Sequence, residues 1–334
     1  MPVTSPPIES LALDIPVAPP KGKSQRTWSL WERPEHLPPL QIQRRDIDIL
    51  YQTFRHRFVT VPHLRVLLGG SPGDRLDKRC RLLWQHGYLQ RPSAQRPTKV
   101  LMEEIVYGLG KKGARLLEDQ YPKLRDAHIG TLDWGETPKK QVGLPYVDHQ
   151  LGIVTVMTCL QAAGTQGIRL HWSGHFYRKQ HRIVPPKPHK PILADAYFTL
   201  TLPDGSHAHH FLEVDRGNVN LEDMHQRYLG YFAYWKALQH QERQGSLPEG
   251  RFKHFRVLLV TADPAYVNSL RRIALPVGRC PDDCTRRHQH YPAWKGLMFS
   301  HLGHFDLAKP QQSLEAIFRY ADDDATISLM PQPR

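Results

Sequence analysis

Cysteine is scarce in this sequence, and long apolar runs are absent from it. Four cysteines in 334 residues are too few for the disulfide framework of a small secreted domain. No apolar run approaches the roughly 18 residues that a membrane span requires. The N-terminus also lacks the charged and then apolar layout of a secretory signal. We therefore expect a soluble, cytoplasmic protein with no membrane partner.

Acidic residues are outnumbered by basic ones. The chain has 45 Lys and Arg against 32 Asp and Glu, which gives a formal net charge of +13 at pH 7. Such a surplus favours a polyanionic partner, because each Lys or Arg that meets a phosphate releases condensed counterions. Charge alone does not separate a nucleic-acid-binding protein from a merely basic one, so a binding element has to be identified in the sequence.

The length suffices for two domains, each with its own core. Residues 1–40 are rich in Pro, Ser and charge and lack any periodicity, which predicts a disordered arm. We expect a first domain over residues 41–121, a linker over 122–145, a second domain over 146–310 and a C-terminal tail over 311–334.

The first domain begins with apolar residues at helical spacing over residues 46–58. Thr60 and Pro62 are a cap and an early proline that open a second helix. A third helix starts at Ser71 and stops at Gly87. A polar loop, a strand-like stretch and a closing helix follow. This order predicts a winged helix-turn-helix domain.

The third helix is the natural recognition helix. Leu76, Cys80 and Leu83 share one face and would pack inward, which leaves a basic face for the major groove of duplex DNA. A merely solvated basic face, or a winged helix used only for protein contacts, are the alternatives. The DNA-binding candidates are Arg75, Lys78, Arg81 and Gln85 on this helix, and Arg91, Arg96 and Lys99 on the wing.

The C-terminal half alternates between helical and strand patterns, which predicts an α/β sheet domain. Two of its strands are joined by Pro203-Asp204-Gly205, a strong turn signal. Asn220 is a plausible cap for the long helix that follows. The expected helices are 148–163, 221–240 and 265–274, and the expected strands are 168–172, 191–202, 207–215, 255–262 and 296–302.

Three acidic residues stand out in this hairpin. If its turn is centred on Asp204, Asp195 lies directly opposite Glu213, with Asp215 two residues further along the same face. Converging carboxylates are costly unless a cation neutralises them, and an all-oxygen site suits Mg²⁺ or Mn²⁺. The alternative is an edge hairpin with solvated acids. A register slip of one residue would separate the pair.

Two stretches resemble a known family. Residues 45–54, 79–92 and 105–117 look like the winged-helix part of the plasmid replication-relaxation family, and residues 192–217 and 225–235 look like its second part. The second part is also similar to the core of PD-(D/E)xK nucleases. This resemblance implies a restriction-endonuclease-like α/β domain with a central mixed sheet, built around an Asp on one strand and Glu-x-Lys on the next.

By that resemblance Asp195 and Glu213 match the two acids and would bind the metal. The position of the Lys is taken by Asp215, which places cleavage in doubt. The cation can instead come from the following helix, where Arg227 is the best candidate. His149, near the start of the domain's first helix, is a further candidate ligand or base, or else a helix cap or surface residue.

Two other groups are candidate sites. The spacing of two cysteines and two histidines is compatible with Zn²⁺, or else with a flexible loop that holds free thiols. A basic loop would suit a phosphate backbone, or is simply solvated. The zinc candidates are Cys280, Cys284, His288 and His290, and the loop carries Arg178, Lys179, His181, Arg182, Lys187 and Lys190.

Two functions remain open. The first is a double-stranded-DNA-binding nuclease or nickase of a plasmid or mobile element, in which Asp195 and Glu213 hold Mg²⁺ or Mn²⁺, Asp215 assists and Arg227 steadies charge. The second is a non-catalytic DNA-binding replication or transfer regulator with a degenerate nuclease fold. Other replication or mobilisation proteins are expected partners in both.

Overall fold

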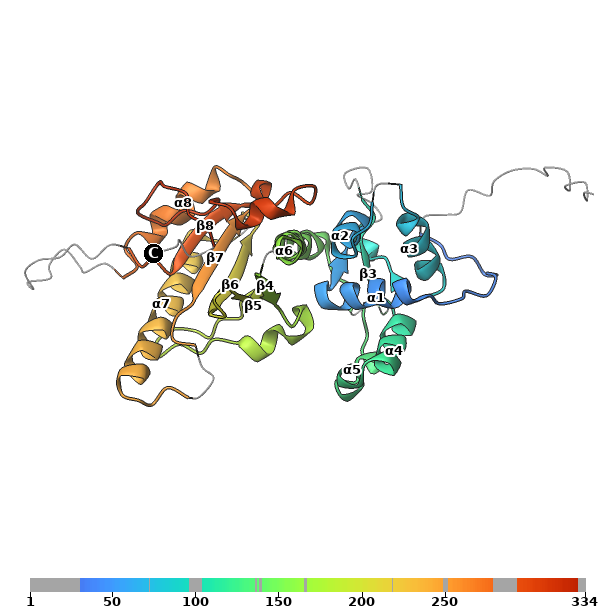
Figure 1. The fold of residues 1–334 in the computed structure, drawn as a ribbon, viewed down its shortest axis with the longest axis horizontal. Coiled ribbons are helices and arrows are strands. Elements are labelled where there is room, and N and C mark those ends of the chain that lie inside the picture. Colours follow the sequence, from blue (N-terminus) through green and yellow to red (C-terminus); the bar gives the residue numbers. More distant parts are fainter. Residues whose placement is uncertain are drawn as a thin grey trace, which may run out of the picture.

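A computed structural model describes residues 31–71, 73–95, 104–135, 137, 140–164, 167–217, 219–248, 252–278 and 293–329. The described chain forms two units on either side of one helix, α6 (Figure 1). The α/β class predicted from the sequence is confirmed, because helices surround a mixed five-stranded sheet. None of the helices in these ranges is both long and apolar enough to span a bilayer.

The N-terminal unit packs four helices around a small antiparallel sheet with the order β1-β3-β2. The expected order of three helices, strands and a closing helix is confirmed. Strand β1 was not predicted, because two residues are too short to show a periodicity. The elements are α1 (Arg44–His56), β1 (Phe58–Val59), α2 (Val61–Leu67), α3 (Leu76–Gln85), β2 (Leu89–Gln90), β3 (Tyr107–Leu109) and α4 (Lys111–Gln120).

The segment expected to be a linker belongs to this unit instead. It contains α5 (Pro122–Asp126) and the 3-10 turn η2 (Ile129–Thr131). Leu124, Ile129 and Trp134 are buried in the same core as the helices. The Trp134 indole also donates a hydrogen bond to the Ile129 carbonyl at 2.9 Å. Burial of these large side chains anchors the segment, which sequence polarity alone did not indicate.

The C-terminal unit is built on a sheet with the order β4-β5-β6-β7-β8. Strands β4, β5 and β6 are antiparallel neighbours, whereas β6, β7 and β8 are parallel. Its elements are α6 (Leu144–Ala163), β4 (Arg169–His171), the 3-10 segment η4 (His175–His181), β5 (Ala196–Thr201), β6 (His207–Asp215), α7 (Leu221–Arg243), β7 (Arg256–Thr261), α8 (Tyr266–Ala274) and β8 (Leu297–His301).

Helices cover both faces of this sheet. Alternate residues of β6 point to opposite faces, as the pleat requires. Leu212 and Val214 pack in the core beneath α6, whereas Phe211 packs in the core beneath α7 and α8. The central strand is therefore buried on both sides, and Glu213 is carried into the α7 face by the same alternation.

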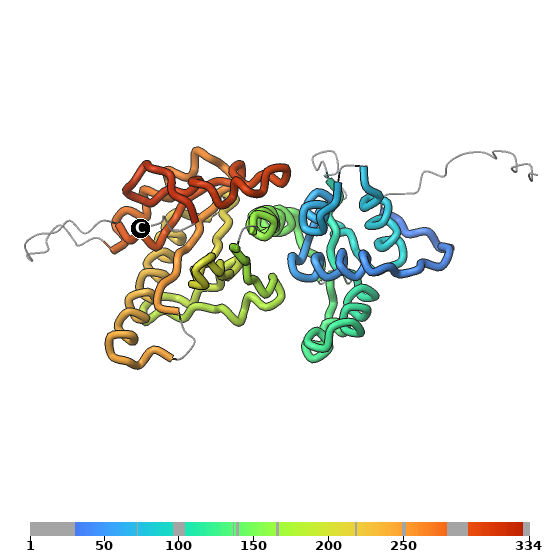
Figure 2. Tube along the Cα trace, viewed as in Figure 1, coloured from blue at the N-terminus to red at the C-terminus, as the bar shows by residue number. Residues whose placement is uncertain are grey.

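Helix α6 also joins the two units, as the chain path in Figure 2 makes visible. His63 of α2 lies with Nε2 3.0 Å from Thr155 Oγ1 of α6. Arg55 of α1 donates to Gln161 Oε1 at 3.1 Å and to the Trp172 carbonyl at 2.8 Å. These contacts connect the N-terminal helices directly to the α/β unit.

Both ends of the described chain pack more than the sequence predicted. In the expected tail, Phe318 and Leu329 are buried in the core on the α6 side. Phe318 pairs with Ile327, so this segment extends the α/β unit past the expected boundary at residue 310. At the other end, Leu40 packs against the N-terminal core. Residues 1–30 of the expected arm lie outside the described residues.

Candidate functional site

The β5–β6 hairpin has the register that its turn predicts. Gly205 adopts a φ of 80°, which favours glycine. The Leu202 amide donates to the Ser206 carbonyl at 2.9 Å and closes the turn. Ala196 therefore pairs with Leu212, and Asp195, one residue before β5, donates its amide to the Leu212 carbonyl at 3.0 Å. This places Asp195 beside the end of β6 that carries Glu213.

Asp195 is held by a histidine and a backbone amide. Its Oδ1 lies 3.0 Å from Nε2 of His149 on α6. Its Oδ2 accepts a hydrogen bond from the Val214 amide at 2.8 Å. The hydrogen bond to Asp195 raises the pKa of His149 above its ordinary value, although partial burial opposes this. The predicted approach of His149 to the carboxylates is thus observed.

Glu213 is buried, with 5 % of its surface exposed, and two side chains of α7 hold it. Arg227 donates from Nε to Glu213 Oε1 at 2.8 Å and from Nη2 to the Leu193 carbonyl at 2.8 Å. The Tyr231 hydroxyl donates to the same Oε1. Positions four apart on a helix share a face, which explains why both reach Glu213.

Burial dominates the protonation of Glu213. Desolvation raises its pKa to about 7, the Arg227 guanidinium opposes that rise, and the charge of Asp195 adds to it. The interaction with Asp195 shows that the two carboxylates are close enough to influence each other. The structure therefore brings together Asp195, Glu213 and Arg227, as predicted, with His149 and Tyr231 beside them.

Asp215 does not join this group. After β6 ends, its Oδ1 accepts a hydrogen bond from the Gly217 amide at 2.8 Å. Its charge acts on Tyr228, whose pKa is raised mainly by burial and then by Asp215. Within the described ranges no group of three or more His, Cys, Asp or Glu side chains is arranged to hold a metal ion. The expected convergence of three carboxylates is wrong for this reason.

As arranged, most of the carboxylate oxygens are engaged by groups of the protein itself. Mg²⁺ needs free carboxylate oxygens together with water. Here Glu213 is ion-paired with Arg227, and both oxygens of Asp195 accept hydrogen bonds. Both hydrogen bonds to Glu213 end on Oε1, so Oε2 is the one carboxylate oxygen of this pair without a hydrogen-bond partner among the described residues. The four zinc candidates, Cys280, Cys284, His288 and His290, lie outside the described residues.

A basic cavity lies next to this group, between the two units. It has a volume of about 480 Å³ and is lined by four cationic side chains, together with Phe54, Trp134, His175 and others. Burial lowers the pKa of His175 to about 3, Arg178 and Arg57 lower it too, and Asp195 opposes them. One acidic side chain, Asp133, also lines the cavity. The four cations are Arg57, Lys140, Arg178 and Lys179.

The rest of the predicted basic loop is dispersed. His181 stacks on Tyr197 with ring centroids 4.3 Å apart. Arg182, Lys187 and Lys190 are exposed. Only Arg178 and Lys179 from this loop therefore line the cavity.

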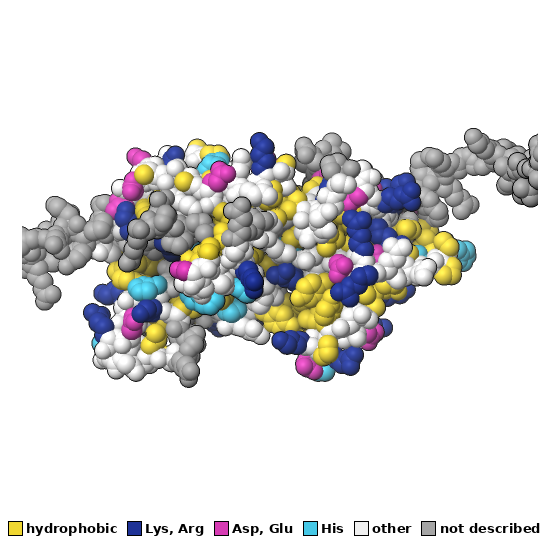
Figure 3. Space-filling view, in the orientation of Figure 1, with side chains coloured by type: hydrophobic (Ala, Val, Ile, Leu, Met, Phe, Trp, Pro, Cys, Tyr) yellow, Lys and Arg dark blue, Asp and Glu magenta, His cyan; other side chains and the backbone are white. Residues whose placement is uncertain are grey.

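Helix α3 presents part of the predicted DNA-binding set. Arg75, Lys78 and Arg81 are exposed, and the opposite face is buried in the core. Arg81 makes an exposed ion pair with Asp77 at 3.8 Å, which constrains it little. Figure 3 shows Lys and Arg side chains distributed over the visible face of the N-terminal unit.

Two other members of that set are not placed for DNA. Gln85 is 9 % exposed because it is the last residue of α3, where the chain turns back into β2. Arg91 packs its guanidinium 3.9 Å from the centroid of the Trp84 ring and donates to the Tyr107 hydroxyl at 2.9 Å. Both corrections arise from tertiary packing. Arg96 and Lys99 lie outside the described residues.

Sequence reasoning missed two residues near α3. Lys111 and Lys112 are exposed at the start of α4. The Lys112 side chain lies beside Gly87, at the end of α3. The signal was present as two adjacent lysines flanked by Gly110 and Gly113, a run that served only to mark a helix start.

Comparison with known proteins gives one match. The family model described as replication-relaxation matches residues 50–249, which is more than half of the chain. No curated protein and no solved structure matches. The family description connects the chain to plasmid replication and relaxation, with DNA and replication-related partners in general. The matched range includes α3, Asp195, Glu213 and Arg227, and the chain belongs to the replication-relaxation family.

Proposed function

We propose that this protein binds duplex DNA through a winged-helix N-terminal unit during plasmid replication or relaxation. The observation that carries the proposal is the exposed basic face of α3, formed by Arg75, Lys78 and Arg81. The opposite face of α3 is fixed in the core, so these cations are presented on a rigid element. The β2–β3 connection is the wing in this proposal.

The proposed DNA-binding surface continues along the N-terminal unit to the cavity, where the α/β unit contributes Arg178 and Lys179. Lys112 extends the cationic surface at the end of α3, and the cavity between the units adds four more cations. Contacts from Lys and Arg to phosphates supply most of the sequence-independent affinity for DNA. The backbone of a bound strand would follow this cationic path towards Asp195.

The acidic group fits a regulatory role better than a metal-dependent one. Its charges are compensated inside the protein, Glu213 by Arg227 and Asp195 by His149. Mg²⁺ prefers several free oxygen ligands, whereas only Oε2 of Glu213 lacks a hydrogen bond here among the described residues. We infer that the chain is primarily a DNA-binding replication protein. Arg227 and His149 compensate the acidic residues of its nuclease-like domain.

Phosphodiester cleavage is the second candidate. Asp195 and Glu213 occupy the two acidic positions of the PD-(D/E)xK pattern at the ends of paired strands. His149, oriented by Asp195, is suited to accept a proton from a water molecule, and Arg227 supplies the cation that the pattern expects at residue 215. This arrangement can act on a phosphodiester without relying on a third carboxylate.

The DNA-binding proposal is tested by fluorescence anisotropy on a labelled duplex across a salt titration. The Lys78→Gln, Arg81→Gln double variant should bind roughly tenfold more weakly, with a smaller salt slope. The matched control is Lys123→Gln, Arg125→Gln on α5, which removes the same charge from another exposed helix. Equal losses in the two variants would assign the binding to net charge and overturn the role of α3.

Cleavage is tested on supercoiled plasmid with Mg²⁺, with Mn²⁺ and with EDTA. Nicking that is lost in both Glu213→Gln and His149→Gln would establish a nuclease and place its site. Nicking that persists in EDTA would favour the His149 route. Plasmid that is shifted on a gel but uncut in every condition would leave DNA binding as the function and reject the second candidate.

A further inference from the structure

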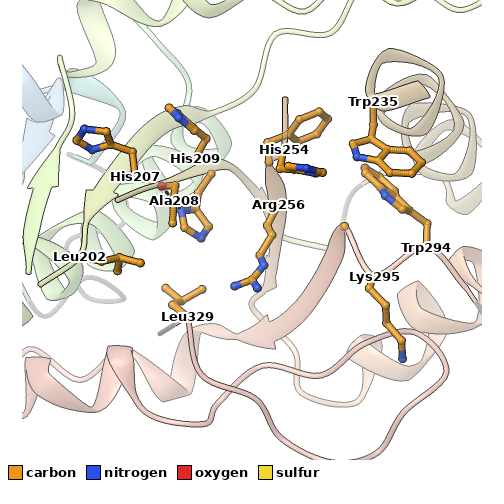
Figure 4. Close-up of a pocket in the computed structure, with 13 residues that line it drawn as sticks. Leu202, His207, Ala208, His209, Trp235, His254, Arg256, Trp294, Lys295 and Leu329 are labelled. Atoms are coloured by element: carbon orange, nitrogen blue, oxygen red, sulfur yellow. Dashed lines mark hydrogen bonds between the residues drawn. The ribbon is translucent and has the colours of Figure 1, made fainter. Parts of the chain in front are cut away.

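A second cavity lies at the other end of strand β6, away from Glu213. Its volume is about 450 Å³. Figure 4 shows His207 and His209 on one side of it, Trp235 and Trp294 on the other, and Arg256 between them. The walls come from the start of β6, the start of β7, α7 and the chain before β8. None of the proposed DNA-binding or acidic residues lines this cavity.

The charges of this cavity are of one sign. Its described lining contains Arg256 and Lys295 and no Asp or Glu. Lys295 is already bound to Asp322, with Nζ 2.6 Å from Oδ1. In the part of the chain that the structure describes, the Arg256 guanidinium makes no hydrogen bond or ion pair with a side chain. A partly buried guanidinium without a counterion favours an anionic ligand.

Aromatic rings form one wall. The rings of Trp235 and Trp294 lie with centroids 5.8 Å apart at an interplanar angle of 40°. Trp235 also stacks on Phe232 at 5.8 Å, which fixes its orientation. Indole faces that border a cavity are suited to stack on a planar heterocycle.

A buried hydrogen-bond acceptor borders the same cavity. Nδ1 of His210 lies 3.0 Å from the Ala208 carbonyl, so Nδ1 carries the hydrogen and Nε2 is left as an acceptor. That Nε2 is buried and has no hydrogen-bond partner among the described residues. Burial lowers the pKa of His210 to about 3, with a smaller contribution from Arg256, so the ring is neutral at pH 7.

We propose that this cavity binds a nucleoside phosphate, with the base against Trp235 and Trp294 and the phosphate on Arg256. The combination excludes simpler ligands. The histidines of the lining are not part of any group of three or more metal-ligating side chains among the described residues, and Arg256 and Lys295 would repel a cation. An aliphatic anion would leave the indole wall unused. The nucleotide is either a free mononucleotide or the terminal nucleotide of a DNA strand. This site is independent of the α3 proposal, because it shares no residue with it.

Isothermal titration calorimetry on the full chain tests the proposal with four probes. These are dAMP, deoxyadenosine, inorganic phosphate and a 5′-phosphorylated single-stranded tetranucleotide. We expect dAMP to bind roughly tenfold more tightly than deoxyadenosine or phosphate alone, because only dAMP engages both the indoles and Arg256. A tetranucleotide that binds roughly tenfold more tightly than dAMP would identify a strand end, and the reverse order would identify a free nucleotide.

Matched variants locate the binding. Arg256→Gln should weaken dAMP roughly tenfold, whereas Arg272→Gln, which removes an exposed arginine of α8, should change it less than twofold. Trp235→Phe keeps an aromatic ring in the cluster and should weaken dAMP less than Arg256→Gln. Absence of dAMP binding by the wild type, or equal losses in Arg256→Gln and Arg272→Gln, would overturn the proposal. The Lys78→Gln, Arg81→Gln variant should bind dAMP normally, which separates this result from failure of the α3 proposal.

Discussion

The two ends of strand β6 differ in whether their charged side chains are paired within the protein. At the end that begins with His207, a cavity holds the neutral His210 and the Arg256 guanidinium, which has no counterion among the described residues. At the end that finishes with Asp215, carboxylates are closed by Arg227, Tyr231 and His149. A charge without a partner in an open cavity can still form an ion pair with a ligand. Charges that are already paired within the protein interact with each other instead. The comparison teaches that the less conspicuous end is the better candidate for binding.

The largest expected effect is the loss of folding stability when buried, neutral histidines are protonated at low pH. Burial holds His210 neutral at one end of β6, and it does the same for His56 and His63 in the N-terminal unit. Because their folded pKa values are depressed, their stability contribution is present above pH 6.5 and is lost as the pH falls below it. On lowering the pH from 7 to 5, these three histidines together should cost roughly 5 kcal/mol of unfolding free energy, and protonation of Glu213 should return about 2 kcal/mol of it.

Urea unfolding followed by circular dichroism at both pH values measures this loss. His210→Phe, which keeps a ring on Phe198, should lose about 2 kcal/mol less than the wild type. Equal stability at pH 5 and pH 7 would contradict neutral burial of these histidines.

Removing the closing cation should have the next largest effect. Arg227→Met leaves Glu213 buried without its ion-pair partner, and at pH 8 this should cost about 3 kcal/mol of unfolding free energy. Adding Glu213→Gln to the same chain should restore most of that loss. Urea unfolding of the wild type, Arg227→Met and the double variant measures both the loss and its recovery. If Arg227→Met had the same unfolding free energy as the wild type, Arg227 would not be compensating the charge of Glu213.

Glu213 alone should respond to pH in the direction opposite to His210. Its folded pKa of about 7 lies above its ordinary value, so the wild type loses stability as the pH rises from 4.5 through 7. Glu213→Gln removes this loss. The stability of the variant relative to the wild type should therefore increase by about 2 kcal/mol between pH 5 and pH 8. A constant difference across that range would mean that Glu213 stays ionised.

Asp215 should matter least. In Asp215→Asn the amide oxygen can still accept the hydrogen bond from Gly217, so the unfolding free energy should change by less than about 1 kcal/mol. Thermal unfolding of the purified variant checks this. A loss of more than twice that amount would place Asp215 in the charged network around Glu213 after all.

The sequence predicted the hairpin and its acids because one local feature controls them. The Pro203-Asp204-Gly205 turn sets the pairing of every residue between Ala196 and Leu212. Asn220 was predicted as a helix cap for a similarly local reason, and its Oδ1 accepts a hydrogen bond from the Glu222 amide at 2.9 Å. Local hydrogen-bond chemistry of this kind can be predicted without knowing the tertiary structure.

The features that were missed depend on distant neighbours. The role of Arg91 is decided by Trp84 and Tyr107, which meet it only after β2 and β3 pair. Tyr231 was noted only as a neighbour of Arg227 on the same helix, with an ordinary core residue as the alternative, and its contact with Glu213 depends on α7 crossing that face of the sheet. Spacing along the chain shows which residues share a face, but it does not show which other element will cover that face.

The junction at α6 has a consequence for how DNA would be read. His63 and Arg55 tie the N-terminal helices to Thr155 and Gln161 of α6, and the same helix carries His149 to Asp195. A duplex seated on α3 would therefore meet the Asp195 end of the sheet at a constant number of base pairs from the recognised sequence. If the α3 proposal holds, the distance along a bound duplex from α3 to the Asp195 end of the sheet is therefore set by α6.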